Sequence, residues 1–149
     1  MAAPRTTPWT ITFDCAHAPR LAEFWKLALG YVDAPPPVGY GSWREWQDAF
    51  DLTDEELAEG AAIADPDDVG PRVSFLQVPE GKTAKNRLHL DVQVGGGRRA
   101  EPEGRTRRIQ ERVDLLVAAG ATVLERGEYD GRLDHYILAD PEGNEFCVV

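Results

Sequence analysis

A histidine, a cysteine and several charged residues fall in two short segments that alternate polar and apolar residues. His89 lies in the segment 86–94, and Cys147 lies in the segment 145–149. A neutral imidazole and a thiolate both bind metals, and both also take part in acid–base or nucleophilic chemistry. His89 is therefore the candidate catalytic residue. Its two interpretations are a metal ligand and a hydrogen-bonded pocket residue.

The charged and polar residues near His89 also have alternative roles. Cys147 is either a nucleophile whose pKa is lowered by His89 or Arg87, or a small residue that lines a pocket, and the second role is favoured. Arg87 either forms a salt bridge to Asp91 or Glu145 or clamps an anionic group of a ligand. His89 paired with Asp91 or Glu145 would make a metal-free acid–base catalyst.

The elements that must position these residues occur twice in the chain. Alternating segments at 9–15 and 86–94 predict strands. Each is followed by an amphipathic helix, over 19–29 and about 106–119, that ends at a glycine. The second unit carries an extra Gly- and Arg-rich loop, Gly95 to Arg105. We interpret the pattern as an internal repeat with one inserted loop.

Further strands complete each unit. A turn at Asp140–Asn144 predicts that the last two strands form a hairpin. The predicted strands are 31–34 and 72–78 in the first half, and 122–125, 134–139 and 145–149 in the second.

An insertion of about residues 42–62 separates the strands of the first half. Thr53 and Glu56 have the spacing of a capping box, which predicts a short helix there. Trp43 and Trp46, three residues apart, either anchor the insertion or form an aromatic lid over a flat ligand. Residues 45–68 hold ten acidic and no basic side chains, so much of this stretch faces water.

Strand alternation divides the side chains into two faces. The expected polar, inward face consists of Thr10, Thr12, Asp14, Arg87, His89, Asp91, Gln93, Glu145 and Cys147. The expected apolar face, packed under the helices, consists of Trp9, Ile11, Phe13, Leu88, Leu90, Phe146 and Val148. A polar inward face in a domain of this size favours a ligand site.

Composition narrows the function classes. The 149 residues carry a net charge of −10, which argues against nucleic acid or an anionic membrane as partner. The N-terminus, Met1–Thr6, lacks the apolar segment of a secretion signal, so we expect a cytoplasmic protein. Cys15 and Cys147 form no zinc pattern and no expected disulfide. The arginines between Arg98 and Arg112 are expected to form a solvated surface that balances the acidic insertion.

Four stretches in order resemble the glyoxalase-like branch of the vicinal oxygen chelate superfamily. They are Ala18–Trp25, Val78–Lys82, Lys85–Val92 and Asp140–Cys147. The resemblance implies an α+β fold in which two tandem βαβββ modules form an open, curved mixed sheet. The modules would span about 6–80 and 84–149 within a single domain, 1–149.

The resemblance also implies where metal enzymes of the superfamily carry ligands. The mapped positions hold Thr10, Gln77, His89 and Cys147, where a metal site would show mainly His and Glu. We therefore expect no tightly held metal or other cofactor. A divalent metal, if it binds, would use His89, Cys147 and Gln77.

The predicted function is small-molecule binding in a polar pocket between the modules, centred on His89. The alternative is a metal-dependent lyase, isomerase or dioxygenase that uses His89, and whether the chain is an enzyme stays open. The expected assembly is a homodimer, as is common in the superfamily. The predicted site consists of Thr10, Thr12, Asp14, Trp43, Trp46, Gln77, Arg87, His89, Asp91, Glu145 and Cys147.

Overall fold

The alternation of residues 9–15 produces the first strand, β1 (Thr10–Cys15). In the computed structural model of the chain, which describes residues 7–149, its odd-numbered residues are buried or half-buried and its even-numbered residues are exposed. The polar side chains Thr10, Thr12 and Asp14 therefore share one face, as predicted. The predicted start of the first module, residue 6, lies outside the described residues.

Helix α1 (Ala18–Leu29) follows, with Pro19 in its first turn. It ends at Gly30, whose φ of 73° favours a residue without a side chain. Its apolar stripe is buried, and the Trp25 ring lies 4.9 Å from the Phe13 ring of β1. Truncating a buried aromatic side chain of this kind typically costs about 3–5 kcal/mol.

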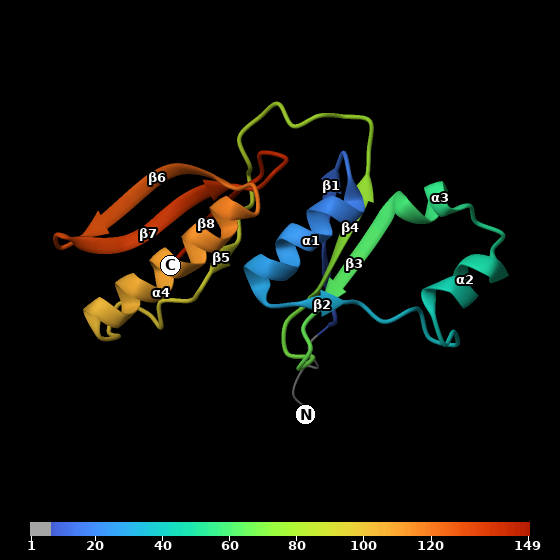
Figure 1. The fold of residues 1–149 in the computed structure, drawn as a ribbon, viewed down its shortest axis with the longest axis horizontal. Helices are drawn as coiled ribbons and strands as arrows, with labels where there is room; N and C mark the ends of the chain where they lie inside the picture. Colours follow the sequence, from blue (N-terminus) through green and yellow to red (C-terminus); the bar gives the residue numbers. More distant parts are fainter. Residues whose placement is uncertain (1–6) are drawn as a thin grey trace, which may run out of the picture. The chain divides into compact units, whose positions relative to one another are not determined.

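The first sheet has the order β1-β4-β3-β2 (Figure 1). The β1–β4 pair is parallel, and the other two pairs are antiparallel. The insertion between β2 and β3 forms two short helices, and the Thr53–Glu56 capping box is confirmed at the start of the second. The elements are β2 (Val32–Asp33), α2 (Trp43–Ala49), α3 (Asp54–Ala58), β3 (Gly60–Ala64) and β4 (Arg72–Gln77).

The second sheet repeats this plan, with the order β5-β8-β7-β6 and a parallel β5–β8 pair. Apart from the inserted helices α2 and α3, the order of elements and of neighbouring strands is the same, which confirms the repeat of two βαβββ modules, each with an open four-stranded mixed sheet. The predicted hairpin across residues 140–144 is confirmed as well. The elements are β5 (Asp91–Val92), α4 (Pro102–Ala118), β6 (Thr122–Tyr129), β7 (Arg132–Ala139) and β8 (Glu145–Val148).

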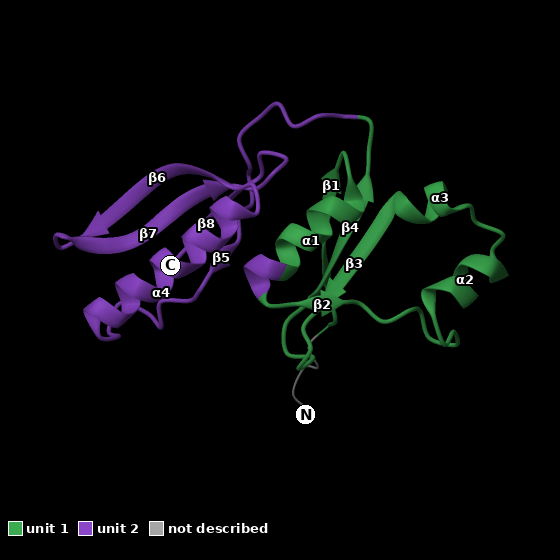
Figure 2. Cartoon of the chain, in the orientation of Figure 1, with its two compact units in different colours: residues 1–26, 30–79 green, residues 27–29, 80–149 purple. Residues whose placement is uncertain are grey.

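The chain forms two compact units (Figure 2). Unit 1 contains the described residues up to Lys26 together with Gly30–Pro79. Unit 2 contains Leu27–Leu29 and Glu80–Val149. That both units make up one domain stays a prediction. Among the described residues, no helix combines the length and apolar character that a membrane span requires.

Several predicted boundaries are wrong; for example, the strand predicted at 122–125 extends to Tyr129, and the strand predicted at 134–139 begins at Arg132. Regular strand in the segment 86–94 is confined to Asp91–Val92, although hydrogen bonds to the last strand run from Leu90 to Val94. Leu88 precedes this ladder and is 68% exposed, so it does not pack under a helix. Trp9 precedes β1 and is 64% exposed for the same reason. Helix α4 starts at Pro102 rather than 106, because the Glu101 carboxylate caps its first backbone N–H groups.

Strand β3 lies partly within the predicted insertion and is missed by the sequence pattern. Its residues, Gly60 to Ala64, are mostly small and do not alternate between polar and apolar. The strand forms because it pairs with β4 over Gly60 to Ile63. A contact of this kind is distant in the sequence, so local periodicity carries no signal for it.

Candidate functional site

The polar face of the first sheet includes residues from two strands. Parallel pairing sets Thr10 beside Arg72 and Thr12 beside Ser74, so all four lie on one face. Gln77 pairs with Cys15, which belongs to the opposite, helix-covered set. The predicted grouping of Gln77 with Thr10 is therefore wrong. The cause is a shift of one residue in the alignment, which reverses the face of a side chain.

In the second unit, three of the predicted residues converge. Pairing of β5 with β8 sets Asp91 beside Cys147, and His89 Nε2 lies 3.4 Å from Asp91 Oδ1. One donor atom from each of His89, Asp91 and Cys147 lies within 4.8 Å of the other two. Nitrogen, oxygen and sulfur donors in this combination suit a zinc-type ion. Asp91 is thus a third donor that the predicted metal set omits.

The environment of Cys147 works against a thiolate. Burial, reinforced by the negative charge of Asp91 and a hydrogen bond to it, raises the pKa of the Cys147 thiol to about 11. The thiol is therefore neutral near pH 7, whereas nucleophilic cysteines have lowered pKa values. This environment favours the role of a pocket-lining residue over that of a nucleophile.

Of the two interpretations of Arg87, the salt bridge to Asp91 or Glu145 is not observed, and the anion clamp stays a prediction. Lys85 Nζ contacts Glu145 Oε2 at 2.7 Å and lowers the pKa of that carboxyl, while Asp91 faces His89. Both expected partners of Arg87 are occupied in this way. Arg87 is exposed and forms no ion pair with any residue from 7 to 149.

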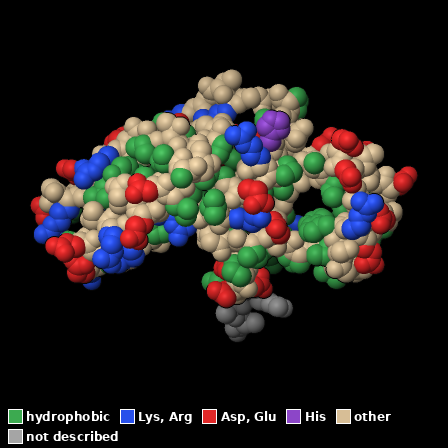
Figure 3. Space-filling view, viewed as in Figure 1, with side chains coloured by type: hydrophobic (Ala, Val, Ile, Leu, Met, Phe, Trp, Pro, Cys, Tyr) green, Lys and Arg blue, Asp and Glu red, His purple; other side chains and the backbone are tan. Residues whose placement is uncertain are grey.

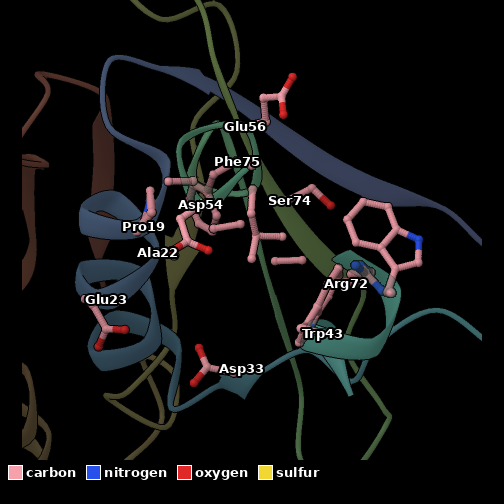
Figure 4. A pocket seen from close by; sticks show the side chains of 16 residues that line it. Pro19, Ala22, Glu23, Asp33, Trp43, Asp54, Glu56, Arg72, Ser74 and Phe75 are labelled. Atoms are coloured by element: carbon pink, nitrogen blue, oxygen red, sulfur yellow. The ribbon is translucent and has the colours of Figure 1, made fainter. Parts of the chain in front are cut away.

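A pocket of about 600 Å³ lies in unit 1 at the edge of the first sheet (Figure 4). Strand β2 pairs only with Ile63 and Ala64, so it leaves the first part of β3 uncovered. Helix α1 contributes to one side of the pocket, and α2 and α3 contribute to the other. The lining residues are Pro19, Ala22, Glu23, Asp33, Trp43, Trp46, Asp54, Glu56, Leu57, Ala58, Gly60, Ala61, Ala62, Arg72, Ser74 and Phe75.

The two tryptophans are held in place by contacts within unit 1. The Trp43 indole Nε1 donates a hydrogen bond to the Ala34 carbonyl at 2.9 Å, just beyond β2. The Trp43 and Trp46 rings meet edge to face, with centroids 5.6 Å apart, and Trp46 also lies 5.4 Å from Phe50. Acidic side chains gather around this α2–α3 segment (Figure 3). The predicted anchor is therefore observed, and both rings also line the pocket.

Most of the residues that line this pocket were not predicted from the sequence. Trp43 and Trp46 belong to the predicted site, but Arg72 and Ser74 do not. The sequence does indicate that Arg72 and Ser74 share one strand face, because they alternate with the apolar residues Val73 and Phe75, which are buried. Their place beside the insertion depends on β3, the strand that the sequence pattern misses.

The arginines between Arg98 and Arg112 are not simply a solvated surface, so that expectation is wrong in part. Arg105 is buried and donates hydrogen bonds to the Leu133 and Asp134 carbonyl oxygens, both at 2.6 Å. Arg98 forms two hydrogen bonds to Asp134 at 2.8 Å and lies over the Tyr129 ring. These arginines tie the Gly-rich loop and α4 to the β6–β7 hairpin.

Two βαβββ units with identical strand order define a protein of the vicinal oxygen chelate superfamily. A family model described as "Glyoxalase-like domain" matches residues 10–149, and the chain belongs to this family. A comparison with curated protein sequences gives no significant match.

Solved structures agree on the fold. A hypothetical protein, SA1046, from S. aureus is 16% identical with a TM-score of 0.56, covering 96% of this chain and 95% of its own. The fosfomycin resistance protein FosX from Mesorhizobium loti is 14% identical with a TM-score of 0.56, covering 99% and 91%. The bleomycin-binding protein from Streptomyces verticillus, solved with copper(II)-bleomycin, is 13% identical with a TM-score of 0.50, covering 99% and 98%. At these identities the likeness concerns the fold alone.

Proposed function

We propose that this protein binds a small organic molecule in the pocket of unit 1. The observation that carries the proposal is a cavity of about 600 Å³ walled by Trp43 and Trp46. Pockets for small ligands commonly measure about 300–1,000 Å³ and combine apolar walls with a few polar groups. Here the alanines of β3 and the two indoles supply the apolar surface.

The lining favours binding over catalysis. No histidine, cysteine or lysine is among the sixteen lining residues of this pocket. The lining thus lacks the usual nucleophile–base combinations. The predicted site centred on His89 in the second module stays a prediction, and it is separate from the pocket of unit 1.

A metal-dependent lyase, isomerase or dioxygenase is the second candidate, favoured by the convergence of His89, Asp91 and Cys147. These three residues would hold the ion, and a metal bound there would supply Lewis-acid activation of a substrate oxygen. The site would have to deprotonate a thiol with a raised pKa, and the His89 and Asp91 side chains are exposed to competing water. For these reasons the binding function ranks first.

The test of the binding function is a fragment screen by ligand-observed NMR, followed by affinity measurements on hits. A hit at the pocket should lose at least about tenfold in affinity in Trp46→Ala, because the indole face is removed. Trp9→Ala, which removes an exposed tryptophan outside the pocket, is the matched control and should bind as the wild type does. Thermal denaturation checks that both variants are folded. Hits that bind Trp46→Ala unchanged would refute the pocket assignment.

We extend the proposal to assembly and location, with a homodimer in the cytoplasm. Strand β6 is an edge strand of the second sheet, and it exposes Val123, Leu124 and Tyr129. Long exposed edge strands with apolar side chains tend to pair with a strand of another chain. Light scattering should give about twice the 16.5 kDa of one chain, and Leu124→Lys should shift the mass toward the monomer. A wild-type mass of one chain at micromolar concentration would contradict the homodimer.

A further inference from the structure

The charged groups around the pocket of unit 1 differ in whether they already have partners. The lining contains four carboxylates, from Glu23, Asp33, Asp54 and Glu56, and one guanidinium, from Arg72. A charged group already held by a partner gains little from a ligand, whereas an unpaired one gains a strong hydrogen bond. The partners therefore indicate which charge a ligand would carry.

One lysine holds the two carboxylates on the α1 and β2 side. Lys26 Nζ lies 2.7 Å from Glu23 Oε1 and 2.9 Å from Asp33 Oδ1. The hydrogen bonds to Glu23 and Asp33 raise the pKa of the Lys26 ammonium, so it stays charged at neutral pH.

The two carboxylates on the α3 side are bound as well. Glu56 Oε2 accepts hydrogen bonds from the Thr53 backbone N–H and hydroxyl, at 2.8 and 3.0 Å, as part of the capping box. Asp54 Oδ1 accepts a hydrogen bond from Gln47 Nε2 at 2.7 Å and lies 3.6 Å from an Arg44 nitrogen.

Arg72 stands apart from these groups. Its side chain is half-buried and forms no hydrogen bond or ion pair with any residue from 7 to 149. It shares a sheet face with Ser74, two residues along β4, and lies on the same side of the pocket as Trp43 (Figure 4). A half-buried guanidinium that has no partner among the described residues is the group in this pocket that gains most from an incoming anion.

We infer that the pocket selects an aromatic molecule that carries a carboxylate, with Arg72 pairing the carboxylate and the Trp43 and Trp46 indoles contacting the ring. This inference rests on the proposed binding function. The planar guanidinium matches a carboxylate with two parallel hydrogen bonds, and the Ser74 hydroxyl supplies a further donor. At 0.15 M salt the Debye length is about 8 Å, so charges far from the pocket are largely screened and the net charge of −10 opposes an incoming anion only weakly. The direct pairing of Arg72 with the ligand carboxylate therefore determines the preference for an anionic ligand.

The test compares three probes of nearly equal shape by calorimetry at pH 7 and 0.15 M salt. They are 2-naphthoate, neutral 2-naphthamide and the 2-naphthylmethylammonium cation. We expect wild-type protein to bind 2-naphthoate at least about tenfold more tightly than 2-naphthamide. In Arg72→Gln this ratio should fall to about one, with 2-naphthamide affinity within about twofold of the wild type. Arg72→Lys should keep part of the preference, since it keeps the charge but not the bidentate geometry.

The control variant is Arg20→Gln, which removes the same charge from an exposed position on α1 outside the lining. It should keep the full preference for 2-naphthoate. Equal binding of naphthoate and naphthamide to wild type, or tightest binding of the cation, would overturn the inference and leave the proposed binding function standing. If no probe binds at millimolar concentration, the proposed pocket itself fails. Unchanged selectivity in a folded Arg72→Gln would overturn the role of Arg72.

Discussion

The indole N–H of Trp43 donates to the Ala34 carbonyl at 2.9 Å, which ties the inserted helix α2 to the chain leaving β2. Ala34 itself is bound to the sheet, because its backbone N–H donates a hydrogen bond to the Ala62 carbonyl of β3. Trp43 thus contacts the sheet edge at the point where β2 ends and the pocket begins. Anchor and pocket wall are two roles of one side chain.

Trp43→Phe should lower the free energy of unfolding by about 1 kcal/mol more than Trp46→Phe does, because both changes replace an indole with a phenyl ring but only the first also removes the hydrogen bond to Ala34. Trp46→Phe is the matched control, since Trp46 contacts its neighbours through ring packing. Urea denaturation of the two variants measures the difference. Equal stability losses in both would show that the Trp43 hydrogen bond contributes nothing.

Asp134→Asn should lower the stability at pH 7 by about 3 kcal/mol, because it leaves the buried Arg105 and its neighbour Arg98 without their carboxylate. Hydrogen bonds from Arg98 hold the pKa of Asp134 well below its usual range, against the effect of burial. A lowered folded-state pKa contributes stability that is complete above the unfolded-state pKa of about 3.9 and is lost as pH falls below it.

The wild type should therefore lose stability as pH falls from 4 toward 2, and Asp134→Asn should show a shallower decline. Denaturation at several pH values measures both curves. Asp130→Asn, an exposed change in the same hairpin, should leave the curve unchanged. Parallel acid profiles for wild type and Asp134→Asn would contradict the assignment.

Cys147 should react slowly with iodoacetamide at neutral pH. With Cys15→Ala as background, the alkylation rate should rise with a midpoint near pH 11, because burial and Asp91 raise the pKa of this thiol to about 11. Asp91→Asn removes the neighbouring negative charge and should move the midpoint to lower pH. A rate that reaches its plateau by pH 8 would instead support a reactive nucleophile.

Elemental analysis of the purified protein should find less than one equivalent of zinc, nickel, iron or manganese. The expectation follows from the raised pKa of the Cys147 thiol and from the exposed side chains of its two partners. His89→Ala is the matched variant. If the wild type holds one equivalent of such a metal and His89→Ala loses it, the metal-dependent enzyme becomes the favoured function instead of small-molecule binding.

Local signals made a large part of the fold predictable. The alternation around Phe13, the stripe of α1 with its Gly30 end, and the Thr53–Glu56 capping box each depend on residues within a few positions of one another. Repetition of the strand–helix pattern then implied the two-module topology, which the matching strand orders confirm.

The pocket could not be predicted in the same way. It depends on how far β2 covers β3, and that is decided by pairing between residues about thirty apart. The role of Arg72 likewise depends on which charges find partners, such as Lys26 with Glu23 and Asp33, and spacing alone does not reveal this. Residues brought together by register, such as Asp91 and Cys147, were assigned to the right face but not to one cluster.

Binding of an aromatic carboxylate in the pocket of unit 1 is tested most directly by following the four indole N–H signals of the ¹⁵N-labelled protein during a titration with 2-naphthoate. Trp43 and Trp46 line the pocket, Trp25 of α1 is buried against Phe13 of β1, and Trp9 is exposed outside the pocket lining. Single Trp→Phe variants assign the signals. If the ligand binds in the pocket of unit 1, the Trp43 and Trp46 signals should shift saturably, with the Trp9 and Trp25 signals unchanged. Saturable shifts confined to Trp9, or to the backbone amides of His89 and Asp91 with the Trp43 and Trp46 signals unmoved, would contradict it.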